Sequence, residues 1–168
     1  MREEREREFD EFVLARQQRL LRTAFLLCGD WYLAEDLTQN ALAKVYVGWN
    51  RIQRVEQIDA YVHRMLFRTF VDTYRRRRKR EILSAAVPDF AGVGTASDVR
   101  LTLLAALAEV SPRYRAVLVL RYWEDRSIAE TAAALGISDG SVKSHANRGL
   151  QQLRSVLGDQ ALDLIESS

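Results

Sequence analysis

The residues of this chain that could do chemistry are cations interleaved with aromatic side chains between positions 61 and 80. The aromatic members are Tyr61, Phe67, Phe70 and Tyr74, and the cations are Arg64, Arg68 and the unbroken run RRRRKR at 75–80. Arginines neutralise phosphates and aromatic faces stack on exposed bases, so the mixture is suited to DNA that is being opened. For Phe67 and Phe70 packing in a core is the favoured interpretation, and for the basic run a solvated surface is the plain alternative.

The sharpest local pattern is a helix-turn-helix at 127–150, SIAETAAALGISDGSVKSHANRGL. Ser127 and Glu130 have the spacing of a capping box, Gly136 suits a turn with positive φ, and Ser138 can cap the next helix. A second helix of this kind fits the DNA major groove. It carries small residues for close approach, cations for phosphates and polar side chains for base edges: Gly140 and Ser141, Lys143 and Arg148, and Ser144, His145 and Asn147. The alternative is an ordinary helical hairpin with a polar solvent face.

A third candidate is a protein-docking face in the segment AEDLTQNALAKVYVGW at 34–49. Its acidic and amide residues fall on one side of a helix: Glu35, Asp36, Gln39 and Asn40. Such a face beside exposed aliphatic residues could dock a protein partner, although a solvated helix face is the default interpretation.

Composition argues against an enzyme. The chain has 168 residues, a formal net charge of +2, one cysteine and two histidines. A lone Cys28 excludes an internal disulfide and favours a reducing, cytoplasmic location. We find no nucleophile–base pair and no metal-ligand spacing, so no cofactor and no metal are expected. The charged start MREEREREFDEF is not a signal peptide, and no apolar stretch is long enough for membrane insertion.

The hydrophobic periodicity predicts helices only. A first block runs from Phe9 to about position 80, with a helix end at Gly29, a cap at Asp30 and a third helix beginning near Asp59. An Ala/Gly/Ser-rich stretch then predicts a flexible linker. A second block follows, in which Ser111 and Pro112 start a helix and the aromatic pair at 122–123 is expected in the core. We therefore predict an all-α protein with two small helical domains at 1–81 and 99–158, a linker at 82–98 and a tail at 159–168.

These segments, in this order, resemble an extracytoplasmic function (ECF) sigma factor, the minimal group of the sigma-70 family. AEDLTQNALAKVYVGW resembles the region-two helix that binds the polymerase clamp, and DAYVHRMLFRTFVDTYRRRRKR the segment that melts and reads the minus-ten element. SPRYRAVLVLRYWEDRSIAETAAALGISDGSVKSHANRGLQQLR resembles region four, which reads the minus-thirty-five element. The wording GDWYLAEDLTQ is similar to the SigE-like branch of actinobacteria.

The resemblance implies a sigma factor without catalytic activity that binds core RNA polymerase and promoter DNA and directs transcription initiation. An anti-sigma factor is a further partner that it leaves open. Carried over by position, the polymerase-binding residues are Asp36, Gln39 and Asn40. The minus-ten residues are Arg64, Arg68, Asp72, Arg75, Arg76 and Arg77. The upstream-box residues are Ser138, Gly140, Ser141, Lys143, Ser144, His145, Asn147 and Arg148.

Three positions depart from the family pattern. Asn40 stands where an acid is usual, Arg68 where an Asn commonly captures an unstacked base, and His145 where Arg is usual. Asn40 could therefore weaken one clamp contact, and Arg68 could change which base is preferred at one promoter position. The DNA contact of His145 could depend on pH. Two other hypotheses fit the residues: a stand-alone helix-turn-helix regulator that never meets polymerase, and a helical adaptor protein.

Overall fold

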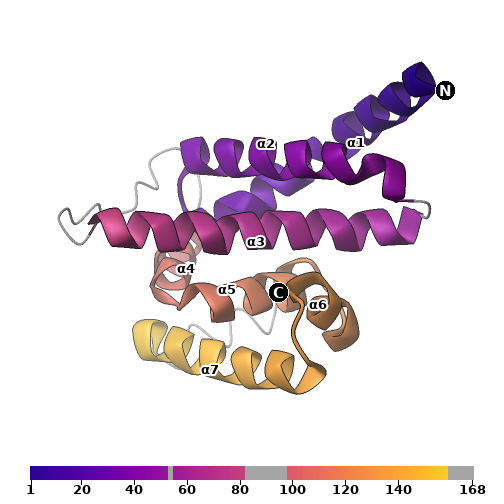
Figure 1. Cartoon of the computed structure of the whole chain (residues 1–168). Coiled ribbons are helices and arrows are strands. Elements are labelled where there is room, and N and C mark those ends of the chain that lie inside the picture. Colours follow the sequence, from indigo (N-terminus) through magenta and orange to yellow (C-terminus); the bar gives the residue numbers. More distant parts are fainter. Residues whose placement is uncertain (53–54, 82–97, 159–168) are drawn as a thin grey trace.

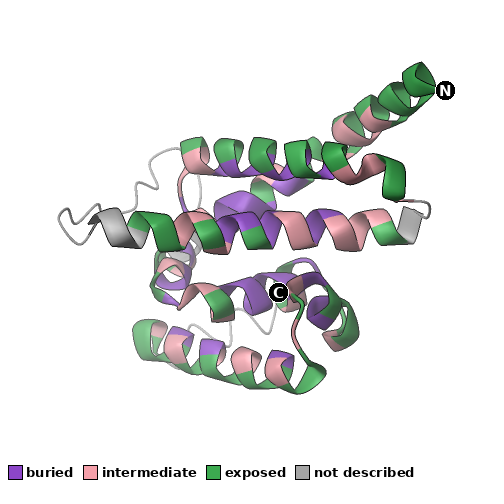
Figure 2. Ribbon diagram, viewed as in Figure 1, coloured by how far each residue is buried: buried purple, intermediate pink, exposed green. Residues whose placement is uncertain are grey.

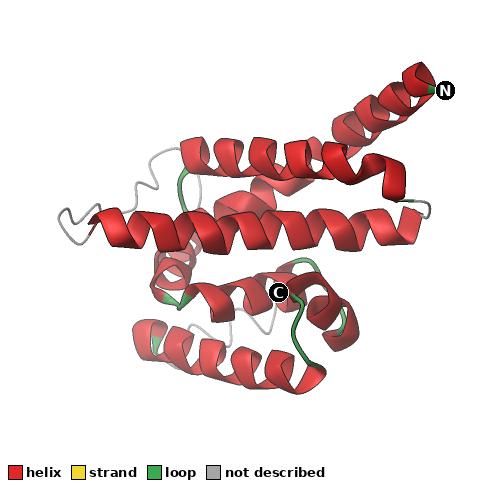
Figure 3. Cartoon of the chain, viewed as in Figure 1, coloured by secondary structure: helices red, strands yellow, loops and turns green. Residues whose placement is uncertain are grey.

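The computed structural model describes residues 1–52, 55–81 and 98–158. The first half contains α1 (Arg2–Cys28), α2 (Trp31–Gly48), the 3-10 turn η1 (Trp49–Arg51) and α3 (Val55–Glu81). The second contains α4 (Asp98–Glu109), α5 (Pro112–Leu118), the π-helical turn η2 (Val119–Trp123), α6 (Ile128–Leu135) and α7 (Asp139–Leu157). The described residues contain no strand (Figure 3), which confirms the predicted all-α class. The predicted linker and tail lie outside the described residues, except Asp98, which begins α4.

The first turn between helices forms as its residues predict. Gly29 has φ +72° and its N–H donates to the carbonyl of Phe25, which ends α1. Asp30 then caps α2, since its carboxylate accepts a hydrogen bond from the N–H of Tyr32 at 2.8 Å. Helix α3 begins at Val55, four residues before the predicted start, and Ile58 in this added turn packs on the core.

Helices α1, α2 and α3 form a three-helix unit around buried aliphatic residues such as Leu27, Val45 and Leu66. Phe67 and Phe70 belong to this core, at 1% and 3% exposure, so the core interpretation of both is confirmed. In the second unit α5 packs on α7, and Gly149 allows the close approach because a Cβ there would lie 3.0 Å from Leu118.

The two units are packed against each other. Helix α6 packs against α3, α4 contacts α1, and α5 contacts both α1 and α3 (Figure 1). One apolar cluster continues from Leu27 and Phe70 through Leu104 and Leu107 to Leu153. Within the described ranges, the helix-turn-helix is therefore held on one side of α3 while α2 occupies the other (Figure 1).

The expectation that Tyr122 and Trp123 lie in the core is wrong. Their exposures are 53% and 49%. Residues 119–123 form a π-helical turn, which shifts the residues that follow away from the α-helical face on which the prediction was based. Leu120, by contrast, is fully buried.

None of the described helices combines the length and the apolar character that a membrane-spanning segment needs.

Candidate nucleic-acid and polymerase interfaces

The helix-turn-helix is built by the caps that its sequence predicts. Ser127 Oγ accepts a hydrogen bond from the Glu130 N–H at 3.0 Å, and Glu130 Oε1 accepts one from the Ser127 N–H at 3.1 Å. The hydrogen bond from the Ser127 N–H to the carboxylate, with smaller contributions from the Ser127 hydroxyl and Arg126, holds the pKa of Glu130 below its usual value. Gly136 turns the chain at φ +66°, and Ser138 Oγ accepts a hydrogen bond from the Ser141 N–H at 3.1 Å to start α7.

Helix α7 buries one side and presents the other to solvent (Figure 2). Val142, Gly149 and Leu153 face the core, and Ile137 packs in the angle between α6 and α7. Six of the predicted upstream-box residues are exposed, namely Ser138, Gly140, Lys143, Ser144, Asn147 and Arg148, and Ser141 and His145 are half-buried. The structure thus brings all eight onto one helix start and its outer side, a surface that fits a major groove.

His145 lies beside the ring of Tyr114 on α5, with the ring centroids 5.2 Å apart. Burial lowers the pKa of His145, and the positive charges of Arg113 and Arg148 lower it further. The imidazole is therefore mostly neutral near pH 7 and offers a hydrogen bond rather than a charge at this surface. Arg148 is held in the same place, since its Nη1 donates to Tyr114 Oη at 3.4 Å.

The six predicted minus-ten residues all lie on α3, in two groups. Asp72, Arg76 and Arg77 are exposed to solvent. Arg68 and Arg75 are also exposed but lie beside the second unit, and Arg64 is half-buried against it. Arg64 Nη2 donates to the carbonyl of Ala133 on α6 at 2.9 Å, and the Arg68 guanidinium lies beside Gly136.

A cavity of about 350 Å³ joins the two predicted DNA-contacting segments. Arg75 of α3 lines it together with His145 and Arg148 of α7, and α5 contributes Arg113 and Tyr114. No acidic side chain lines this cavity among the described residues. Arg113 and Tyr114 are not among the predicted contact residues, although the cation and ring in SPRYR, directly after a helix cap, were a usable signal.

The third predicted face, on α2, lies apart from the other two. Asp36, Gln39 and Asn40 are all exposed. Figure 2 shows that the exposed residues of α2 lie on the side of the helix away from α3. Tyr32 and Val47, which lie at helical spacing along the same side, are exposed at 87% and 83%. The face therefore combines acidic and amide groups with unburied apolar area, which is typical of a protein-docking surface.

In the described part of the chain, no three side chains of His, Cys, Asp or Glu lie close enough together to form a metal site.

Comparisons with known proteins match each half of the chain to a region of the sigma-70 family. The family model described as Sigma-70 region 2 matches residues 12–80, and the one described as Sigma-70, region 4 matches residues 100–153. Among solved structures, the chain is similar to the sigma factor RpoE of Bartonella quintana, solved in complex with the anti-sigma factor NepR. The TM-score is 0.74 at 22% identity, over 90% of this chain and 98% of that one, and supports the fold.

Curated relatives are similar over nearly the whole length. The RNA polymerase sigma-E factors of Streptomyces avermitilis and Streptomyces coelicolor are each 40% identical over 159 residues. The match covers 93% of this chain and 88% and 89% of those proteins. The ECF RNA polymerase sigma factor SigE of Mycolicibacterium smegmatis is 33% identical over 95% of this chain and 65% of its own length. With both regions matched in order, the chain belongs to the ECF sigma factors of the sigma-70 family.

Proposed function

We propose that this sigma factor binds core RNA polymerase through the exposed face of α2 and thereby directs transcription initiation from specific promoters. Asp36, Gln39 and Asn40 are the polar contacts, and Tyr32 and Val47 supply the apolar ones. Support comes from the exposure of all five side chains on one side of a helix that is otherwise packed on α1 and α3. Asn40 is uncharged, so it contributes a hydrogen bond where an acid would contribute a charge.

The outer side of α7 reads the upstream box, in this proposal. Lys143 and Arg148 hold phosphates, and Ser144, His145 and Asn147 meet base edges. Ser138, Gly140 and Ser141 form the helix start, where free backbone N–H groups and small side chains admit a phosphate. The supporting observation is the exposed or half-buried position of all eight residues beside a rigidly capped turn.

The minus-ten element is assigned to α3. The exposed residues Arg76 and Arg77 supply positive charge, Asp72 lies among them, and Arg64, Arg68 and Arg75 extend the basic surface along the helix. Capturing an unstacked base here would offset the few kcal/mol that opening a duplex costs. Arg68 can stack on a base but cannot make the paired hydrogen bonds of an amide, so the base preference at this position differs from the family pattern.

The two regions form separate domains at 1–81 and 99–158, joined by residues 82–98, and both grip one promoter while polymerase holds them. Tethering raises the effective concentration of the second contact once the first is made. Polymerase performs the phosphodiester chemistry, because the sigma factor supplies only binding surfaces. The chain therefore acts in the cytoplasm, where transcription takes place, and an anti-sigma factor is a further expected partner because the Bartonella relative is bound to one.

The observation that carries the proposal is the exposed acid–amide face of α2, because this face serves neither unit's packing. The test is charge reversal by Asp36→Arg, followed by co-purification with core polymerase. The matched control is Asp10→Arg, which reverses an exposed acid on α1. We expect D36R to lose core binding with an unchanged circular dichroism melt, and D10R to keep it. Retained binding by D36R would show that the docking face lies elsewhere, and absence of binding by the wild type would favour a stand-alone regulator.

A further inference from the structure

Two charged side chains of the second unit are buried against the first. Glu124, which follows η2, is 7% exposed, and Arg115 of α5 is 3% exposed. A buried charge is stable only where partners satisfy it. Each of the two residues has partners in the first unit: Glu124 is bonded by Thr23, and Arg115 donates to Leu27. These partners are far away along the chain.

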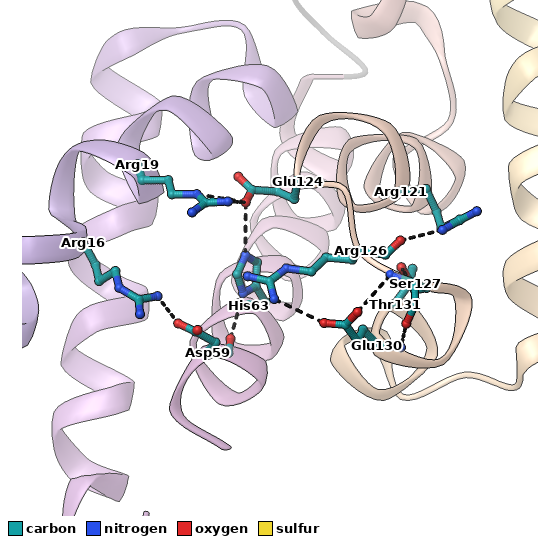
Figure 4. A network of polar contacts seen from close by, with 10 residues as sticks. All are labelled: Arg16, Arg19, Asp59, His63, Arg121, Glu124, Arg126, Ser127, Glu130 and Thr131. Atoms are coloured by element: carbon teal, nitrogen blue, oxygen red, sulfur yellow. Dashed lines mark hydrogen bonds and ion pairs between the residues drawn. The ribbon is translucent and has the colours of Figure 1, made fainter. Parts of the chain in front are cut away.

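Glu124 receives its hydrogen bonds from the first unit. Thr23 Oγ1 on α1 donates to Glu124 Oε1, and Arg19 donates to Oε2 through Nε at 3.2 Å. Arg19 Nη2 lies 3.0 Å from Oε2, and His63 Nε2 on α3 lies 3.8 Å from it (Figure 4). Both carboxylate oxygens are therefore held by groups that would be absent if the units separated.

Arg115 joins the ends of two helices from different units. Its Nη1 donates to the carbonyl of Leu27 at the end of α1, and its Nη2 donates to the carbonyls of Ala108 and Val110 at 2.7 and 2.8 Å. The guanidinium also lies 5.6 Å from the ring centroid of Phe70 on α3. These are carbonyls at helix ends that lack partners within their own helices.

This packing occupies one side of α3. Arg64 is bonded to α6, and Arg68, although exposed, lies beside the turn at Gly136. The helix-turn-helix therefore obstructs a DNA strand that would follow both arginines along this side of α3. The outer side of α7 is not involved, since Lys143, Asn147 and Arg148 are exposed. The two predicted DNA surfaces are thus affected differently by the same packing.

We propose that this arrangement is a closed form in which Glu124 is the latch, so that the part of the minus-ten surface at Arg64 and Arg68 is obstructed by α6 while the basic end of α3 and the upstream-box surface stay accessible. The inference rests on the assignment of α3 to the minus-ten element. In the described residues two buried nitrogens, Arg64 Nε and Arg126 Nε, have no hydrogen-bond partner, and their desolvation opposes the closed form. A ligand that binds the open form more tightly, such as core polymerase, shifts the equilibrium away from it.

The first test of the latch measures the distance between α1 of the first unit and α6 of the second. Spin labels are placed at Gln17→Cys on α1 and Ala129→Cys on α6, both exposed, in a Cys28→Ser background, and measured by pulsed electron paramagnetic resonance. We expect one narrow, short distance for the otherwise unaltered chain. Glu124→Gln and Thr23→Val should each shift it to longer and broader values, because each removes one side of the same contact. Glu109→Gln, an exposed acid of the same unit, should leave it unchanged.

Two outcomes overturn the latch. One is a long, broad distribution in the unaltered chain, and the other is a short distance that survives in both E124Q and T23V. Thermal melts of all variants accompany the measurement, and the two variants remove the contact from opposite sides, so either one that stays folded decides.

The covering of α3 is tested by binding to a fluorescein-labelled single-stranded DNA 20-mer of mixed sequence. Apparent affinity scales with the fraction of competent molecules, so E124Q and T23V should bind about fivefold or more tightly than the wild type. E109Q makes the same charge change as E124Q and should bind as the wild type does, and T23V changes no charge. Equal affinities in chains that the spin labels show to be open would overturn the covering. Run-off transcription with core polymerase tests the promoter function separately, because that function stands even if the covering fails.

Discussion

Arg115 and Leu27 lie 88 positions apart and are joined by a buried hydrogen bond between a guanidinium and the carbonyl at the end of α1. The same guanidinium satisfies the carbonyls of Ala108 and Val110 at the end of α4. Burial lowers the pKa of Arg115, while Tyr74 nearby favours the charged form. The Arg115 side chain therefore caps the carboxyl ends of α1 and α4, and it links the two sigma regions.

Replacing Arg115 should be among the most destabilising changes in the chain. A lysine cannot reach three carbonyls with one ammonium, so Arg115→Lys leaves buried acceptors unpaired. We expect a loss of about 1–3 kcal/mol in the free energy of unfolding for each carbonyl left unpaired, measured by urea denaturation. Arg113→Lys, an exposed change on the same helix, should stay within about 0.5 kcal/mol of the wild type. Similar values for the two variants would contradict the role given to Arg115.

Acid should weaken the contribution of Glu124. Burial alone would raise its pKa, but the nearby His63 imidazole, the hydrogen bond from Thr23 and the charge of Arg19 lower it to about 2, from an ordinary 4.5. Because the folded-state pKa is depressed, the stabilisation is complete above pH 4.5 and disappears as the pH falls towards 2. The wild type should exceed Glu124→Gln by roughly 1.5–3 kcal/mol at pH 7, and the difference should shrink through this window. Urea denaturation of both chains at several pH values measures it, and a constant difference would contradict the pKa.

The sequence predicted local structure well and contacts between distant residues poorly. The capping box at Ser127 and Glu130 and the turn at Gly136 follow from residues close together in the chain, and both are present. Glu124 and Arg115 are buried by groups about a hundred positions away, so no periodicity could indicate their burial.

For the candidate site, the sequence predicted which side of each helix is exposed on α2 and α7. It did not predict that Arg64 on α3 would donate to α6, because nothing in the sequence of a helix specifies which other helix packs on it. The error at Tyr122 and Trp123 has a local cause, since a π-helical turn breaks the period of 3.6 residues on which the prediction relied.

Gly149 should be intolerant of any side chain. A Cβ there would lie 3.0 Å from Leu118 and 3.2 Å from Tyr114, where α7 meets α5. Gly149→Leu should therefore destabilise the chain by about 1–3 kcal/mol despite the better helix propensity of leucine. Gly140→Leu is the matched control, because only Ser138 lies within reach of a Cβ there, at 3.9 Å, and we expect no loss of stability. Thermal melts of both variants decide, and an equally stable G149L would mean that the two helices are less closely packed than described.

The basic end of α3 should dominate the salt dependence of single-stranded DNA binding. Arg75, Arg76 and Arg77 are exposed, so each can neutralise a phosphate and release a counterion. Replacing all three by Gln should lower the slope of log affinity against log salt by about 2. The control replaces Arg2, Arg5 and Arg7, three exposed arginines of α1, and should leave the slope unchanged although the net charge falls equally. Equal slopes for the two triple variants would indicate that the basic run is only a solvated surface.

Arg148 should contribute specifically to the upstream box. Its side chain is exposed on the outer side of α7 and is positioned by the hydroxyl of Tyr114. If it meets a base, Arg148→Ala should weaken binding by roughly 1–3 kcal/mol and relax the sequence preference at one position. Arg154→Ala removes the same charge from the far end of the same helix and should change neither. The measurement is footprinting of holoenzyme on a promoter that it transcribes, with single-base changes across the upstream box. A footprint and base preference that are identical in R148A and the wild type would exclude Arg148 from base recognition, whereas a uniform loss at every sequence would assign it to a phosphate.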